Sequence, residues 1–235
     1  MEKKKRIVVL TGAGISAESG LSTFRDADGL WENHPVAEVA THEALERNPK
    51  AVYDFANMLR RNLQKAEPNP GHLLLAELEK DYDVVILTQN IDDLHERAGS
   101  KSVLHLHGEL MKACTIDRPD RPIPLPGGRL DINPGDTDGE GRPLRPFIVY
   151  FGEDVPNYTR AMKETEKADL FVVIGSSLNV YPVAGLLYYV PDGVPCFVID
   201  PKPVQTPYRT FRQIQKGASE GMAELRAKLE AGEII

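Results

Sequence analysis

The chain has 235 residues, a formal net charge of −7, and a composition that is 41% hydrophobic and 27% charged. These values are typical of a globular protein with one large domain, or one domain that carries a smaller insertion. The acid excess argues against a protein that coats nucleic-acid phosphates. No apolar stretch has the length of a membrane span, and too few apolar residues follow the basic segment 3–6 for a signal peptide. We therefore expect a cytoplasmic protein that binds neither nucleic acid nor a membrane.

The cysteine content predicts no disulfide framework. Cys114 and Cys196 are the two cysteines of the chain, and no C-x-x-C motif is present. Two distant cysteines are typical of small buried side chains in a reducing compartment.

Apolar, β-branched runs alternate with helical patterns along the chain, and this alternation predicts an α/β fold. Four runs read as buried parallel strands: 7–10, 84–87, 170–174 and 196–199. Shorter runs at 103–106 and 147–151 are expected to add strands. The helical patterns occupy 49–65, 71–80, 91–98, 158–167 and 219–231. We expect a Rossmann-like parallel sheet with helices on both faces.

Two segments depart from this alternation and predict a small inserted module. Residues 32–70 form a helical excursion, and residues 113–146 are rich in proline, glycine, aspartate and arginine. The second segment is expected to be loop-rich or partly mobile. Residues 1–31, 71–112 and 147–235 would then form the sheet domain.

A glycine-rich segment follows the first predicted strand. Gly12, Gly14 and Ala17 fit the spacing G-x-G-x-x-[GA], which provides a tight turn and a close backbone approach to a pyrophosphate. A glycine turn after a strand also occurs without any ligand, so the spacing alone leaves both interpretations open.

Polar residues follow the other predicted strands. Residues 88–92 (TQNID) could bond ribose hydroxyls and a carboxamide, or could cap the next helix. Residues 175–177 (GSS) suit phosphate or ribose contacts, or a simple turn. Asp200 could accept hydrogen bonds from the adenosine ribose, or could be a turn residue before Pro201. In an open α/β sheet these ends meet at one edge, where ligands bind.

Two histidines lie two residues apart in the segment HLHGE. Gly108 would let a substrate approach His107, whose imidazole can serve as a general base near neutral pH. Structural histidines and a His-x-His zinc site are the alternatives, and no further ligand cluster supports the zinc site.

Together, these segments resemble the sirtuin family of NAD-dependent protein-lysine deacylases. The segments GAGISAESGLSTFRD, TQNIDDLHERAG, HLHGE, FGE and GSSLNVYPVAG occur in the family's order and cover nearly the whole chain. The segments GLWENH and PNPGH are similar to the bacterial and mitochondrial branch called class III.

The resemblance implies a role for each matching residue. The catalytic residues would be His107, Asn90 and Asp92. NAD would be bound by Gly12, Ala13, Gly14, Ser16, Phe24, Arg25, Trp31, Gln89, Asn90, Ile91, Asp92, Gly175, Ser176, Ser177, Asp200, Pro201, Lys202 and Ala218. An acyl-lysine protein or peptide would lie as an added strand against Phe151, Gly152, Glu153, Asn179 and Val180, with Ala56 and Leu59 beside the acyl group. The implied reaction consumes NAD and releases nicotinamide and O-acyl-ADP-ribose, with His107 as the general base.

The chain departs from the family pattern at the zinc site. Sirtuins usually carry four cysteines in two pairs between the catalytic histidine and the FGE segment, and here only Cys114 remains. We therefore expect no zinc and no other metal.

A second departure concerns the acyl group. Class III members that remove succinyl or malonyl groups carry Tyr-x-x-Arg, and Ala56 and Leu59 occupy these two positions here. Tyr53 and Arg60 could replace that pair only in a shifted register. Acetyl or longer apolar acyl groups are the expected substrates.

Other functions use part of the same pattern. Protein ADP-ribosylation also begins with the loss of nicotinamide, and a catalytically weak NAD or ADP-ribose sensor would keep the nucleotide site. Intact His107, Asn90 and Asp92 argue against the sensor. An oxidoreductase is less consistent, because nothing resembles a separate substrate domain.

Overall fold

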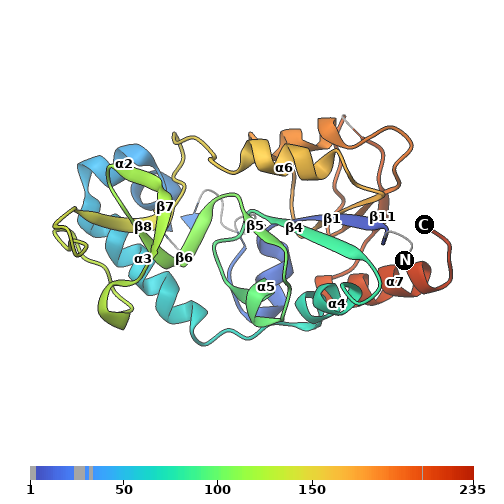
Figure 1. Cartoon of the computed structure of the whole chain (residues 1–235), viewed down its shortest axis with the longest axis horizontal. Coiled ribbons are helices and arrows are strands. Elements are labelled where there is room, and N and C mark those ends of the chain that lie inside the picture. Colours follow the sequence, from blue (N-terminus) through green and yellow to red (C-terminus); the bar gives the residue numbers. More distant parts are fainter. Residues whose placement is uncertain (1–3, 24–29, 32–33, 208) are drawn as a thin grey trace.

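The centre of the molecule is a six-stranded parallel sheet, seen edge-on in Figure 1. The computed structural model describes residues 4–23, 30–31, 34–207 and 209–235. The strand order is β11-β10-β9-β1-β4-β5. The bounds are β1 (Arg6–Thr11), β4 (Asp83–Thr88), β5 (Val103–His105), β9 (Leu170–Ile174), β10 (Cys196–Ile199) and β11 (Arg212–Ile214). All four predicted long strands are therefore present and parallel.

The strand order changes direction at β1, and this change creates the ligand edge of the sheet. The chain runs from β1 to β4 and β5 on one side, then returns to β9 and β10 on the other. The carboxyl ends are in register, because Thr11 pairs with both Thr88 and Ile174. Ligands of open α/β sheets bind at such a switch point.

Helices cover both faces of the sheet (Figure 1). One face packs against α6 (Tyr158–Thr165) and η4 (Val183–Tyr189), and the other packs against α4 (Pro70–Leu78) and α7 (Ala218–Glu230). The short elements α5 (Leu94–Arg97) and η1 (Ala13–Ser19) follow β4 and β1. The strands are apolar on both faces because both faces are buried.

The PNPGH segment starts α4 through a capping box. The Asn69 side chain accepts a hydrogen bond from Gly71 N at 2.9 Å, and His72 Nδ1 accepts one from Asn69 N at 3.3 Å. Pro70, which lacks an N–H, is the first helical residue, where no hydrogen bond is lost.

A small module lies at one end of the sheet domain (Figure 1). Its helices are α1 (Val36–Val39), α2 (His42–Arg47) and α3 (Pro49–Leu63). Its sheet has the order β7-β6-β8, with β6 (Gly108–Thr115), β7 (Arg118–Pro124) and β8 (Leu144–Ile148) antiparallel. The remaining short elements are β2 (Leu30–Trp31), β3 (His34–Pro35) and η3 (Pro126–Gly128). Val52 and Tyr53 of α3 pack on Ala113, Ile132 and Leu144, which joins the helices to the sheet. The boundaries expected for this module stay a prediction.

Three expectations for local structure need correction. Segment 113–146 is not simply loop-rich, because it contains β7 and the start of β8, and Ile132 is fully buried. The strand expected at 147–151 ends at Ile148 and belongs to the antiparallel sheet. The helix expected at 91–98 is only Leu94–Arg97. Its N-cap residue is Asp93, and Asp92 Oδ1 accepts a hydrogen bond from Leu94 N at 3.1 Å in the turn before the helix.

In the part of the chain that the structure describes, no helix combines the length and the apolar character needed to cross a bilayer.

Candidate active site

A single continuous cavity of about 460 Å³ runs from the carboxyl edge of the parallel sheet to the small module. It brings together most of the residues that the sequence singled out, from segments far apart in the chain. These are Gly12, Ala13, Gly14, Ser16, Trp31, Ala56, Leu59, Gln89, Asn90, Ile91, Asp92, His107, Phe151, Gly152, Glu153, Gly175, Ser176, Ser177, Val180, Asp200, Pro201 and Lys202.

Four predicted site residues are not placed on this cavity. Ala218 is buried at the start of α7, and its neighbour Gly217 lines the cavity instead. Asn179 is exposed and does not line the cavity. Phe24 and Arg25 lie outside the described residues.

The glycines at the switch point allow two loops to touch. Gly14 N donates to Gly175 O at 2.9 Å, and a Cβ at Gly14 would come within 2.5 Å of Gly175 Cα. A Cβ at Gly175 would come within 2.3 Å of Ile15 N, at a φ of +62°. Side chains would therefore separate the loops after β1 and β9, which form one end of the cavity.

A buried polar cluster lies below that end. Ser16 Oγ donates to Asp92 Oδ2 at 2.9 Å and accepts from Asn90 Nδ2 at 3.2 Å. Burial raises the pKa of Asp92, although hydrogen bonds from Leu94 N and Ser16 oppose that effect. The N-cap residue of α5 is Asp93, outside segment 88–92. One oxygen of Asp92 accepts a hydrogen bond from Leu94 N in the turn before α5, and the other accepts from Ser16 Oγ.

His107 lines the same cavity as the polar cluster and the apolar side chains of the small module. Its Nδ1 is 3.0 Å from Gln89 O, and a carbonyl can only accept, so Nδ1 carries the proton and Nε2 is the basic nitrogen. Burial lowers the pKa of His107, partly offset by the Gln89 bond. The imidazole is therefore neutral near pH 7, which is the form required of a general base.

His105 plays a different part, because its side chain faces away from this cavity. Its Nε2 is 2.9 Å from Glu96 Oε1, and its Nδ1 is 3.0 Å from Asn90 O. In the described part of the chain, no three His, Cys, Asp or Glu side chains are grouped so that they could hold a metal ion.

One side-chain hydrogen bond links the ends of β4 and β9, and another closes the turn after β10. Ser176 Oγ donates to Gln89 Oε1 at 2.7 Å, and Asp200 Oδ1 accepts from Lys202 N at 2.9 Å. The second bond is the turn interaction expected of an Asp two residues before its partner.

The apolar end of the cavity was missed by the sequence reasoning. Its walls are the buried side chains of α1, α3 and β6, namely Val39, Val52, Phe55, Leu63 and Leu110, beside Ala56 and Leu59. The sequence signal for this wall is the apolar spacing along α3, which places Val52, Phe55, Ala56, Leu59 and Leu63 on one side of the helix.

Tyr53 and Arg60 do not replace the missing Tyr-x-x-Arg pair. Tyr53 Oη donates to Leu144 O at 2.6 Å, and Arg60 donates to Leu110 O and Asn57 Oδ1 at 2.7 and 2.6 Å. Both side chains face the small sheet, and neither lines the cavity.

The fold is that of an α/β protein with a Rossmann-like parallel sheet, and one cavity at its switch point is lined by a neutral histidine, polar side chains and apolar side chains. The sequence profile described as the Sir2 family matches residues 12–182. The chain therefore belongs to the Sir2 family and is a sirtuin.

Individual relatives are similar to this chain over almost its full length. An NAD-dependent protein deacylase of Bacteroides thetaiotaomicron is 54% identical over 229 residues, which are 96% of this chain and 98% of the relative. A solved Sir2 homologue in complex with NAD is 36% identical with a TM-score of 0.85, covering 97% of this chain and 91% of that one. A Sir2 structure with a deacetylated p53 peptide and 3′-O-acetyl ADP-ribose is 30% identical with a TM-score of 0.79, covering 99% of this chain and 95% of that one.

Proposed function

We infer that this sirtuin is an NAD-dependent protein-lysine deacylase that transfers the acyl group to ADP-ribose and releases nicotinamide. The place of His107 carries the inference, because this histidine lines the same cavity as the polar cluster around Asp92 and the apolar side chains of α3. The polar end suits NAD, and the apolar channel suits an acyl-lysine side chain. The deacylase name of the Bacteroides relative and the NAD and peptide complexes support the same reaction.

The chain's own residues would each perform a defined step. NAD, when bound, supplies the ribose that accepts the acyl group. Asn90, Asp92 and Ser16 would orient that ribose, and Ser176 would hold Gln89 beside it. His107 Nε2 would remove the proton of a ribose hydroxyl, and its Nδ1–H bond to Gln89 O would keep the ring in place.

The deciding experiment incubates the protein with NAD and an acetyl-lysine peptide and follows nicotinamide and deacetylated peptide together. Equal amounts of both products, abolished by His107→Ala, are expected. Nicotinamide release with ADP-ribose on protein would favour the transferase, and binding of NAD without turnover would favour the sensor.

We also propose that the acyl group is acetyl or a longer apolar chain. Ala56 and Leu59 line the channel among other apolar side chains, and no cation among the described residues lines it near them. A buried carboxylate without a partner would be strongly disfavoured. Equal kcat/KM for succinyl-lysine and acetyl-lysine peptides would contradict this preference.

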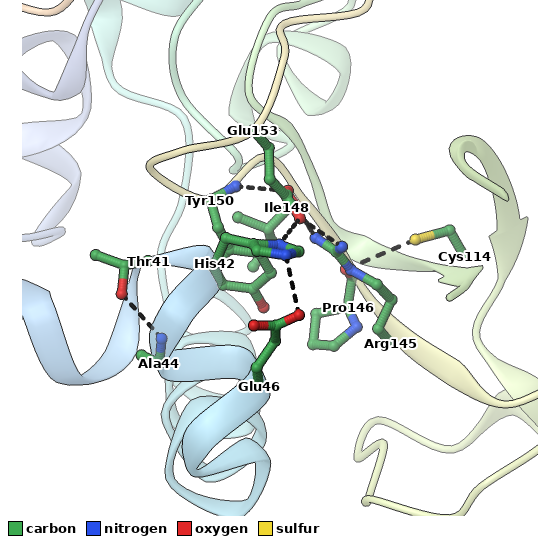
Figure 2. Close-up of polar contacts among 10 residues, drawn as sticks. All are labelled: Thr41, His42, Ala44, Glu46, Cys114, Arg145, Pro146, Ile148, Tyr150 and Glu153. Carbon is green, nitrogen blue, oxygen red and sulfur yellow. Dashed lines mark hydrogen bonds and ion pairs between the residues drawn. The ribbon is translucent and has the colours of Figure 1, made fainter. Parts of the chain in front are cut away.

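We further propose that the small module folds without zinc. The Cys114 thiol is buried, donates to Pro146 O at 3.8 Å, and has its pKa raised to about 11 by burial (Figure 2). Zinc binds the thiolate, which this environment disfavours, and Cys196 lies in β10 of the other sheet. Elemental analysis should find no stoichiometric zinc, and a chelator should leave thermal unfolding unchanged. One bound zinc per chain would refute the proposal.

A further inference from the structure

The segment Phe151–Glu153, against which the acyl-lysine peptide is expected to lie, follows β8 and is tied to the helices of the small module. Phe151 N donates to Ala40 O at 2.9 Å, and His42 N donates to Phe151 O at 2.9 Å. This short bridge fixes the start of the segment to the junction between α1 and α2. Gly152, which follows, has a φ of +94° and no backbone atom near its Cβ position. The bridge therefore does not determine the direction of the rest of the segment.

The far end of this segment is held by a buried ion pair with Arg145. Arg145 NH1 donates to Glu153 Oε1 at 2.7 Å, and NH2 donates to Oε2 at 2.9 Å and to Ile148 O at 2.8 Å. The guanidinium also lies over the Tyr150 ring, 4.8 Å from its centroid. Figure 2 shows that the two charged groups face each other across the turn between β8 and the segment.

Glu153 accepts further hydrogen bonds, so its carboxylate is fully engaged. Tyr150 N donates to Oε2 at 3.0 Å, and His42 Nδ1 is 3.0 Å from Oε1. Burial favours the neutral acid, but the hydrogen bonds from Arg145 and Tyr150 outweigh it and lower the pKa of Glu153. The side chain of Arg145 is only 5% exposed, so it cannot contact a peptide directly.

Arg145 lies opposite Cys114 in the β6–β8 ladder. Arg145 therefore lies beside Cys114 in the sheet and also binds Glu153, which lines the cavity.

We propose that Arg145 is a positioning residue for the acyl-lysine peptide, acting through its bidentate bond to Glu153, which sets the direction of the segment Phe151–Glu153. The proposal rests on the deacylase function inferred above. A rigid edge lets a peptide add as a strand without first ordering the protein backbone. Loss of the bond should therefore weaken peptide binding and leave the NAD end, on the other side of His107, unaffected.

The test compares Arg145→Met and Arg145→Lys with Arg142→Met. Arg142 is a matched control, because it is in the same insertion and pairs with Asp138 at 2.7 Å, away from the cavity. Peptide KM and kcat are measured at saturating NAD, peptide Kd by anisotropy of a labelled acetyl-lysine peptide, NAD Kd by calorimetry, and folding by thermal unfolding.

For Arg145→Met we expect peptide KM and Kd to rise about tenfold or more, with kcat and NAD Kd nearly unchanged. Arg145→Lys should recover part of the affinity, because an ammonium can keep one of the two bonds. Arg142→Met should behave as wild type. Folded Arg145→Met with wild-type peptide KM, or equal losses for peptide and NAD, would overturn the proposal.

A second variant keeps the test decisive if Arg145→Met does not fold. Glu153→Gln retains the shape and removes the charge, so it should also raise peptide KM selectively, and an unchanged KM would refute the positioning role. Failure of the wild type itself to bind or deacylate the peptide would instead remove the proposed function, and with it this inference.

Discussion

Gly108 is the residue where a single methyl group should affect both stability and catalysis. It follows His107 and starts β6, with a φ of +88°. A Cβ at this position would come within 2.2 Å of Phe147 O and 2.9 Å of Ile148 Cα. Because both contacts are with the backbone of the paired strand β8, no side-chain rotation can relieve them. Alanine at position 108 must therefore separate β6 from β8.

The size of the effect follows from two separate costs. A non-glycine residue in this left-handed region costs about 1–2 kcal/mol, and overpacking against a rigid neighbour costs about 1–3 kcal/mol more. Gly108→Ala should thus lower the free energy of unfolding by about 2–5 kcal/mol. Gly99→Ala is the matched control, because Gly99 has a φ of +99° with nothing within 4 Å of its Cβ position. Gly99→Ala should lower the free energy of unfolding only by the cost of the left-handed backbone conformation, about 1–2 kcal/mol.

Urea unfolding of both variants measures this difference, and kcat on an acetyl-lysine peptide measures its consequence. A displacement of His107 by about 1 Å would lower kcat about 100-fold, whereas Gly99→Ala should keep wild-type kcat. Equal stability losses in the two variants would show that the clash is not real. Wild-type kcat in Gly108→Ala would show that the β6–β8 contact does not position His107.

Two further predictions concern the cavity, and a third concerns the His105–Glu96 pair outside it. The double substitution Ala56→Tyr and Leu59→Arg should convert acetyl preference into succinyl preference, raising the succinyl kcat/KM by about 10- to 100-fold through charge-assisted hydrogen bonds; no gain for succinyl-lysine would show that α3 does not line the acyl channel. Because burial lowers the pKa of His107, kcat/KM should rise with pH through a midpoint below about 6.5; a midpoint above that value would contradict the assigned environment. Burial lowers the pKa of His105, but the hydrogen bond that His105 donates to the Glu96 carboxylate outweighs it and raises the pKa overall. The pair therefore stabilises the fold below about pH 6.5 and loses this contribution as pH rises through the folded pKa. Glu96→Gln should accordingly reduce Tm more at pH 6 than at pH 9, and an equal reduction at both pH values would exclude this linkage.

The parts of the protein that could be predicted from sequence are those with a local physical cause. The strand Leu170–Ile174 is apolar at every position because both faces are covered, and that pattern is visible in five letters. The glycines of the first loop and the polar residues after each strand are also local patterns, and they indicate the edge of the sheet where a ligand is expected. The family motifs extend this to His107, which lines the cavity, and its role as the base stays a prediction.

Pairings across long sequence distances could not be predicted, because they depend on the order of the strands. The strand Arg118–Pro124 has the sequence RPDRPIP, which locally disfavours a strand, and it forms one because β6 provides the hydrogen-bonding partner. The apolar channel arises where α3 faces β6, and nothing in the helix sequence alone says which neighbour it will have.

The sequence by itself therefore determined the α/β class, because that class depends on apolar runs of neighbouring residues. The ordered motifs also predicted the ligand edge and His107 as the base, and these roles stay predictions. Only the tertiary structure decided that Tyr53 and Arg60 face away from the channel, and that Arg145 forms a buried ion pair with Glu153. Those contacts depend on which face of each element is turned toward its neighbour, and that choice is made by packing of the whole chain.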